Sequence, residues 1–445
     1  MYGVDGRSEG ERVTEHRRQE AVGGLKARRA ALRAIGRVLR DGAPLTFPRK
    51  EAASLDHAEL AMARRISAAV FRHFARAESV LDNCLRHKPP MSVGNILRLA
   101  VTEIHACGTK PHAAVDQAVR LVTGDGRIRS YSGMVNAVLR RASGEEGWRW
   151  WADAGPPRLP EWISRRLEEA YGPDVLRRIE AAHEVPPPLD LTSRAAVGLE
   201  GLARRLGAES LPTGSLRLHE WGQVSELHGF ADGAWWVQDA AAAIPVRLLG
   251  RIEGLRVVDL CAAPGGKSMQ CAAVGAEIVA VDKSAERLET MRENLARTSL
   301  EIRLVNADAL SWQPDADIIV IDAPCSATGT IRRNPELPYR RRGKGWLRSL
   351  EEGQKRLLQH GLRQVKPGGR VLYCVCSLLP GEGEHVVQWA VRELGAGVVR
   401  RDLREIGADP GWETTEGGVR LRPDYWPEIG GMDGFYAAVL TPRGS

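Results

Sequence analysis

Two cysteines each follow a short apolar run, and a cysteine in that position can act as a nucleophile. Cys325 lies in the string DAPCS after the run IIVI, and Cys376 lies in the later string LYCVCS. An open α/β sheet presents its ligands and reactive groups at the ends of its strands. A thiolate there can form a covalent bond to a substrate. We therefore predict that Cys376 is a nucleophile and that Cys325 is its partner.

The remaining cysteines show no metal or redox spacing. The chain has seven cysteines, and no two have the CxxC spacing of a zinc site or a redox motif. We therefore expect free thiols in a reducing compartment and no metal. Buried cysteine usually packs as a small hydrophobic residue, as we predict for Cys84, Cys107, Cys271 and Cys374.

Three aspartates end or follow successive strand-like runs. Asp282 ends IVAVD, Asp308 follows the next run, and Asp322 ends IIVID. A single acid at such a place is commonly a helix cap or a solvated turn residue. Three acids at successive strand ends, however, would line one crevice. A carboxylate at the end of the second strand can accept hydrogen bonds from both hydroxyls of a ribose. The sequence thus predicts a nucleoside ligand.

The turn DLCAAPGGKS comes before the first of these runs, IVAVD. Its glycines allow close approach of a ligand to the backbone, and the following helix start offers free N–H groups. Gly266, Lys267 and Ser268 mimic the end of a P-loop, but the earlier glycine that a P-loop needs is missing. A ligand-binding turn and a structural turn both remain open on these residues alone.

The elements that must position these residues alternate between strands and helices. Strands are expected at residues 257–260, 278–282, 302–305, 318–322 and 371–375, with helices such as 286–297 and 346–365 between them. This alternation predicts a mainly parallel, doubly wound sheet. Residues 26–143 instead show apolar residues three and four apart, interrupted by prolines, which predicts an all-α domain.

The chain is too long for one ordinary domain, and we divide it into four parts. They are a flexible tail at 1–24, the all-α domain at 25–145, a connector with a small mixed subdomain at 146–234, and the α/β domain at 235–445. Four tryptophans and several prolines indicate a connector after residue 144, and a single helix is expected around 163–183.

The net charge of +7 favours a polyanionic partner, although a merely soluble basic surface fits equally well. Arg332, Arg333 and the run RRRGK that follows predict a phosphate clamp at the mouth of the site, with a solvated loop as the alternative. No apolar run is long enough for a membrane helix, and no signal-peptide core is present. We expect a cytoplasmic protein and no membrane partner; a monomer is our guess.

Several motifs resemble one known family in the same order. DLCAAPGGKS, VDKSAERL, DAPCSATGTIRRNPEL, VKPGGRVLY and the CS followed by LPGEGE are similar to the RsmB/Sun family of RNA cytosine-5 methyltransferases, which use S-adenosylmethionine. PHAAVDQAV and VNAVLRR resemble the NusB-like RNA-binding domain of that family, and VQDAAAA and DGFYAAVL fit its flanking motifs. The resemblance implies a NusB-like domain followed by a Rossmann-like methyltransferase domain.

The resemblance also implies roles for single residues. Cys376 would attack carbon 6 of cytosine, Cys325 would assist release of the product, and Asp322 would hydrogen-bond the base. Lys267 is a candidate for lowering the pKa of Cys376. The cofactor would be held by the residues of the turn together with three aspartates, which are Cys261, Ala262, Ala263, Pro264, Gly265, Gly266, Lys267, Asp282, Asp308 and Asp322.

The chemistry does not identify which RNA is the substrate. The NusB-like motifs favour small-subunit ribosomal RNA, while transfer RNA or another RNA is the alternative, and a non-catalytic RNA-binding factor is a further one. The chain departs from the family at Val375, where threonine is usual, and at residues 189–194, where an arginine-and-asparagine strand is usual. The second departure questions whether that segment positions RNA.

Overall fold

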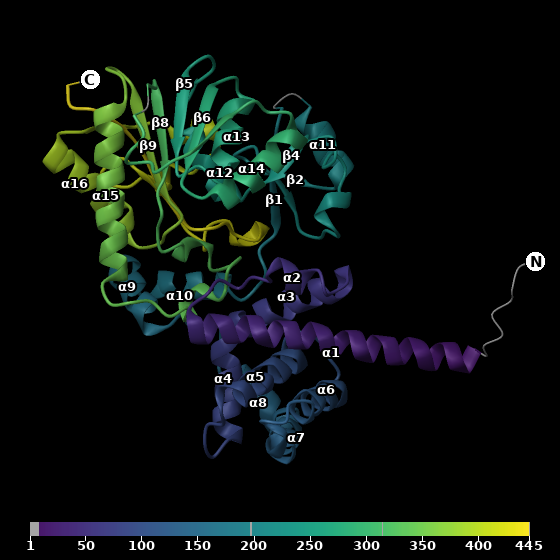
Figure 1. Cartoon of the computed structure of the whole chain (residues 1–445). Coiled ribbons are helices and arrows are strands. Elements are labelled where there is room, and N and C mark those ends of the chain that lie inside the picture. The colour runs from purple at the N-terminus through teal and green to yellow at the C-terminus, as the bar shows by residue number, and fades with distance from the viewer. Residues whose placement is uncertain (1–8, 196–197, 314, 445) are drawn as a thin grey trace, which may run out of the picture. The chain divides into compact units, whose positions relative to one another are not determined.

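The computed structural model describes residues 9–195, 198–313 and 315–444, with side chains from residue 24 onward. The chain forms two units (Figure 1). One contains Met1–Glu161 together with Asn334–Arg342, and the other contains Trp162–Arg333 and Gly343–Ser445. Among the described residues, no helix is both long and apolar enough to cross a membrane.

The first unit is helical. Its elements are α1 (Glu9–Asp41), α2 (Arg49–Ala52), α3 (His57–Arg72), α4 (Phe74–Cys84), α5 (Met91–His105), α6 (Pro111–Thr123), η1 (Arg129–Tyr131), α7 (Ser132–Ala142) and α8 (Glu145–Asp153). Asp56 and Glu59 form a reciprocal capping box at the start of α3, and Pro111 occupies the first turn of α6. Residues 1–8 of the predicted tail lie outside the described residues, and α1 begins at Glu9 within that tail.

The later segment Asn334–Arg342 packs into the same unit. Its short helix η4 (Leu337–Tyr339) places the Tyr339 ring 4.6 Å from the ring of Phe74, between centroids. The backbone N–H of Leu45 donates to the Glu336 carboxylate at 3.4 Å, and Arg340 Nε donates to the Gly42 carbonyl at 2.9 Å. The helical unit is therefore built from two stretches that are far apart in the sequence.

The second unit opens with two helices and a small antiparallel sheet. The helices are α9 (Glu161–Tyr171) and α10 (Pro173–Ala182); Gly172, at φ 81°, and Pro173 interrupt the single helix expected there. The sheet has the order β2-β3-β1-β4, formed by Glu209–Ser210, Leu216–Leu218, Leu189–Ser193 and Trp235–Val237. Helix α11 (Leu199–Leu206) and the short helix η2 (Val224–Glu226) complete this part.

The large sheet has the order β10-β12-β9-β8-β5-β6-β7, and β11 pairs with β12. Strands β5 (Arg256–Leu260), β6 (Glu277–Asp282), β7 (Arg303–Asn306), β8 (Ile318–Asp322) and β9 (Arg370–Val375) run parallel. Strands β10 (Gly397–Val399), β11 (Val419–Leu421) and β12 (Phe435–Thr441) add an antiparallel edge. The predicted fold class, an all-α domain before a Rossmann-like doubly wound domain, is confirmed.

Five helices accompany the large sheet: α12 (Ala240–Arg247), α13 (Gly266–Ala273), α14 (Ala285–Thr298), α15 (Trp346–Gln364) and α16 (Glu384–Leu394). The remaining short helices are η3 (Thr328–Thr330), η5 (Pro380–Glu382), η6 (Leu403–Ile406), η7 (Pro410–Trp412) and η8 (Pro427–Ile429). Because β5 lies between β6 and β8, the strand order reverses there, and in such sheets the crevice at the carboxyl end of the strands holds the ligand.

Candidate catalytic site

The two sulfur atoms that the sequence singled out lie side by side at the carboxyl end of the sheet. Cys325 follows β8, Cys376 follows β9, and their Sγ atoms are 3.4 Å apart. The hydrogen bond to Cys376 raises the pKa of the Cys325 thiol well above its usual value, and burial adds to this effect. Cys325 therefore keeps its proton and can donate a hydrogen bond to the sulfur of Cys376.

One buried carboxylate holds both cysteine loops. Glu382 is fully buried and accepts from the backbone N–H of Ser326 at 2.8 Å and from the hydroxyls of Ser326 and Ser377, each at 2.5 Å. Gln354 donates to the same carboxylate at 3.1 Å. Each serine directly follows one of the cysteines, so Glu382 fixes the distance between the two loops. Sequence reasoning did not single out Glu382, although it lies in the quoted string LPGEGE.

Lys267 and Asp322 form an ion pair beside the thiols. Lys267 Nζ lies 2.7 Å from Asp322 Oδ2, and it also lies over the Phe435 ring at 4.8 Å from the centroid. Burial opposes the charged form of Lys267, but the surrounding groups, Asp322 first among them, together outweigh burial and raise the pKa of this lysine. A negative charge on Cys376 also stabilises the charged lysine. The ammonium group of Lys267 is thus shared between its ion pair with Asp322 and the neighbouring sulfur atoms.

A cavity of about 240 Å³ lies at the ends of β5, β6 and β7. Cys261, Asp282, Asp308 and Pro324 line it, together with Lys283, Arg287, Ala309, Leu310, Gly353, Arg356 and Leu357. Asp282 is buried and accepts from the backbone N–H groups of Ala263 at 3.1 Å and Ser284 at 2.9 Å. Arg287 Nη1 also donates to Asp282, at 3.4 Å. A carboxylate accepts about four hydrogen bonds, so Asp282 retains capacity for a further donor such as a ligand hydroxyl.

The turn between β5 and α13 has the special backbone geometry that the string DLCAAPGGKS indicated. Cys261 has φ 66° and Gly265 has φ 103°, both in the left-handed region. A Cβ at Gly265 would lie 2.8 Å from the Met291 side chain, so no larger residue fits there without a shift. Ala262 and Ala263 are buried, and Lys267 emerges from the first turn of α13. The turn thus brings Cys261 to the cavity and Lys267 to the thiols.

Arg332 and Arg333 follow the Cys325 loop but lie inside the protein. Arg332 is buried and donates to the carbonyls of Gly430 and Met432, both at 2.9 Å. Arg333 pairs with Asp239 at 2.5 Å and with Asp433 at 3.1 Å. The phosphate clamp predicted for these two arginines is therefore wrong, because buried carboxylates and carbonyls engage them. Residues 341–344, in contrast, are exposed.

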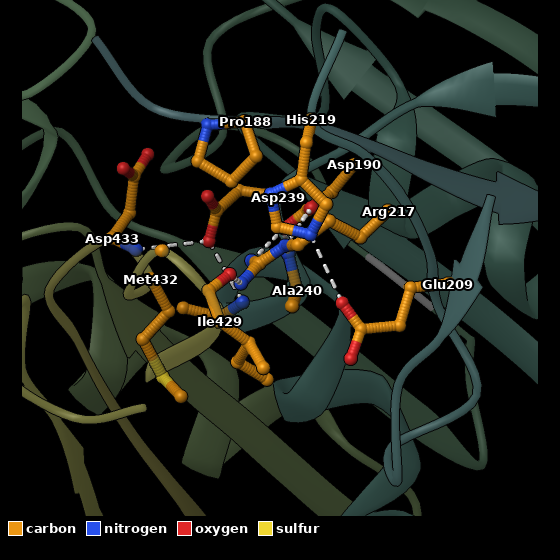
Figure 2. Close-up of polar contacts among 12 residues, drawn as sticks. Pro188, Asp190, Glu209, Arg217, His219, Asp239, Ala240, Ile429, Met432 and Asp433 are labelled. Carbon is orange, nitrogen blue, oxygen red and sulfur yellow. Dashed lines mark hydrogen bonds and ion pairs between the residues drawn. The ribbon is translucent and has the colours of Figure 1, made fainter. Parts of the chain in front are cut away.

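Those aspartates belong to a buried polar network that joins distant segments (Figure 2). The backbone N–H of Asp433 donates to Asp239 at 3.1 Å, and that of Ala240 donates to Asp190 at 2.9 Å. Asp190 also binds Arg217 through both carboxylate oxygens, each at 2.7 Å. The network connects the segment before Phe435 with the small sheet and with the loop that carries Cys325.

A further buried acid, Asp259, contacts α13 directly after the turn between β5 and α13. Asp259 of β5 is buried and accepts from the Ser268 hydroxyl at 2.5 Å, while its Oδ1 has no hydrogen-bond partner among the described residues. Burial raises the pKa of Asp259 to about 7. The folded protein therefore binds a proton at Asp259 more tightly than the unfolded chain does.

This proton makes the stability of the second unit depend on pH. Between about pH 4 and pH 7 the folded state holds the Asp259 proton and the unfolded chain does not, so stability falls as pH rises. The free energy of unfolding should fall by on the order of 3 kcal/mol over this pH range in the wild type, and we expect Asp259→Asn to remove most of this fall. Thermal unfolding at pH 5 and pH 8 measures it, and equal pH dependence in both proteins would contradict the assignment. Asp433, whose pKa burial also raises to about 7, accounts for a remaining slope.

Comparison with known proteins adds sequence and structural relatives. The family model described as 16S rRNA methyltransferase RsmB/F matches residues 246–441, and the NusB family model matches residues 25–143. The ribosomal RNA small subunit methyltransferase B of Vibrio cholerae is 31% identical over 411 residues, covering 87% of this chain and 90% of that protein. Its namesake in Xanthomonas campestris is 31% identical, covering 95% of this chain and 98% of that protein.

Solved structures share the fold. The crystal structure of PH0851 superimposes with a TM-score of 0.71 at 23% identity, covering 94% of this chain and 98% of that one. A methyltransferase homolog from Pyrococcus horikoshii gives a TM-score of 0.53 at 26% identity, covering 63% of this chain and 94% of that one. Together with the sequence relatives, these structures extend the similarity across both units.

Proposed function

Because this chain belongs to the RsmB/F family of 16S rRNA methyltransferases, we propose that it methylates carbon 5 of a cytosine in small-subunit ribosomal RNA through a covalent cysteine adduct. The observation that carries this proposal is the pair of thiols 3.4 Å apart, beside the ion pair of Lys267 and Asp322. One thiol can attack and the other can assist, and a charged pair can polarise a base between them.

The adduct solves a problem of reactivity. Carbon 5 of cytosine is a weak nucleophile, so the Cys376 thiolate first forms a bond to carbon 6 and makes carbon 5 electron-rich. S-adenosylmethionine, when bound, supplies an electrophilic methyl group for that carbon. Carbon 5 then loses its proton to water, and the electron pair of that C–H bond restores the double bond between carbons 5 and 6. The bond between Cys376 and carbon 6 breaks at the same time, and its electron pair returns to sulfur. The protonated Cys325 is placed to donate a hydrogen bond to this departing sulfur.

Asp322 and Lys267 are proposed to stabilise the charge that develops on the cytosine during the reaction. Asp322 is partly exposed, so one side of its carboxylate faces Lys267 while the other can accept from the amino group of cytosine. It can also accept from ring nitrogen 3 when that nitrogen carries a proton. The target base must leave its stack to reach this crevice, as single-stranded or unstacked RNA permits. Lys267 would thus hold the Asp322 carboxylate in a fixed orientation.

The cavity beside the turn contains hydrogen-bond acceptors of the kind that would bind S-adenosylmethionine. Asp282 would accept from the ribose hydroxyls, Asp308 would approach the adenine, and residues Cys261–Lys267 would surround the methionine part. Asp308 is exposed and its Oδ1 accepts from the Leu310 N–H at 2.8 Å, so its loop is ordered next to the cavity.

Asp282→Asn is expected to weaken binding of S-adenosylmethionine by about tenfold or more, since hydrogen bonds to a charged group contribute about 1.5–3 kcal/mol. Calorimetric titration with the cofactor measures this change. Asp317→Asn is the matched control, because Asp317 lies just before β8, at the opposite end of the sheet. Unchanged affinity in folded Asp282→Asn would remove Asp282 from the proposed cofactor site.

The activity is tested by transfer of labelled methyl from S-adenosylmethionine to total RNA, followed by mapping of 5-methylcytosine. We expect label in small-subunit ribosomal RNA, at cytosine carbon 5. Label confined to transfer RNA would refute the substrate, and label on another atom would refute the cysteine mechanism. Absence of transfer to RNA from cells that lack the protein would refute the enzymatic function.

A further inference from the structure

A second cavity, of about 470 Å³, lies in the second unit away from the thiols. Residues of the small sheet, of α12 and α13, and of the segment around η6 line it. Ile252 precedes β5, and Ala273 and Val274 end α13, so these lining residues belong to the amino ends of the parallel strands. The cysteines lie at the carboxyl ends of the same sheet. The cavity is therefore separate from the candidate catalytic site.

The charged side chains of this cavity are mainly arginines. Arg194, Arg247 and Arg401 line it, together with one acid, Glu405, which pairs with Arg401 at 3.1 Å. Within the described part of the chain, no carboxylate lies within ion-pair distance of Arg247, and burial lowers the pKa of this arginine. A half-buried guanidinium without a carboxylate partner is costly unless an anion accompanies it.

Two glycines make room for the guanidinium groups. A Cβ at Gly214 would lie 2.9 Å from the nearest guanidinium nitrogen of Arg247, and Gly250 has the guanidinium of Arg401 in the corresponding place. Both glycines have positive φ, at 78° and 71°. The arginines thus lie directly against the backbone at the wall of the cavity.

Several donors around the cavity have no partner within the described ranges. These are Arg247 Nε, Arg401 Nε and the hydroxyls of Thr192 and Thr213. Thr192 is 5% exposed and Thr213 is 1% exposed, so both hydroxyls are removed from bulk water. Buried polar groups are nearly always hydrogen-bonded, and an unsatisfied donor costs about 1–3 kcal/mol. Four such donors lie in the residues that line this cavity, so the protein itself supplies too few acceptors in this region.

We propose that this cavity binds a phosphate group. The guanidinium fork of an arginine matches the oxygens of a phosphate. Three arginines against one glutamate leave an excess of positive charge for a phosphodiester or a phosphate monoester. The phosphate comes either from the backbone of an RNA bound to this protein or from a free phosphorylated molecule. The site does not depend on the proposed methyl transfer.

The first test measures binding of inorganic pyrophosphate to the full chain by calorimetry. We expect Arg247→Ala and, separately, Arg401→Ala to weaken binding at least tenfold and Arg247→Lys to restore part of it. Arg251→Ala is the matched control, because Arg251 is 89% exposed and pairs with Glu253 at the surface. Circular dichroism and cofactor affinity show whether each variant is folded.

The second test identifies the source of the phosphate with a small-subunit ribosomal RNA fragment over a range of salt concentrations. If the site holds the RNA backbone, Arg247→Ala weakens RNA binding and lowers the salt slope by about 0.7 per lost contact. If RNA affinity is unchanged while pyrophosphate binding falls, the ligand is a free phosphorylated molecule. The proposal is overturned if folded Arg247→Ala and Arg401→Ala bind both probes like the wild type, or if the wild type binds neither.

Discussion

Cys376→Ala is expected to abolish methyl transfer, with a fall of at least about 10⁴-fold, the scale seen when a covalent nucleophile is removed. The physical reason is that carbon 5 of cytosine stays unreactive without addition at carbon 6. Cys325 does not replace the missing thiolate, because burial still raises the pKa of its thiol when the hydrogen bond to Cys376 is gone. Transfer of labelled methyl to RNA under single-turnover conditions measures the loss.

The control for this change is Cys271→Ala, which removes another buried thiol from α13. This variant should transfer methyl at the wild-type rate. Binding of S-adenosylmethionine to Cys376→Ala should also be unchanged, because the lining of the cofactor cavity does not include Cys376. Normal transfer by Cys376→Ala would show that the reaction does not pass through this thiol.

Cys325→Ala is expected to accumulate a covalent complex between protein and RNA. Addition through Cys376 and methylation still proceed in this variant, but the hydrogen bond from Cys325 to the departing sulfur is lost. Product release then becomes the slow step, and turnover falls while the adduct builds up. Denaturing gel electrophoresis with labelled RNA shows the adduct as a slowly migrating band.

The double variant Cys325→Ala with Cys376→Ala separates this explanation from non-specific trapping. It should form no adduct, because the bond to RNA is made by Cys376. A band of equal intensity in the double variant would place the covalent bond elsewhere. Rapid turnover without any adduct in Cys325→Ala would show that Cys325 has no part in release.

Much of the second unit follows from local sequence patterns. Short apolar runs that alternate with helical segments predict β5 to β9, because buried parallel strands are apolar on both faces. Strand ends then predict the positions of Cys325 and Cys376, since parallel strands bring their carboxyl ends together. Their sulfur separation of 3.4 Å was not predictable, because it depends on Glu382, which joins the Cys376 loop to Ser326, 56 residues earlier in the chain.

The failures share one physical cause, which is that a partner distant in sequence decides the environment. Arg333 looks like a solvent-exposed base in the string IRRNPEL, but Asp239 and Asp433 surround it. The four tryptophans after residue 144 suggested a connector, whereas three of them lie in α8 and Trp162 lies in α9. The Trp151 ring of α8 stacks on His105 at 5.0 Å between centroids. Composition alone does not reveal such pairings.

The segment Asn334–Arg342 also affects the order in which the protein can fold during synthesis. The helical unit that begins the chain includes this segment, which leaves the ribosome about 180 residues after Glu161. At translation rates of roughly 5–20 residues per second, the delay is roughly 10–40 s. During that interval the rings of Phe71 and Phe74 lack Tyr339 as a neighbour. The first unit to be synthesised is thus completed only after most of β5 to β8 has emerged.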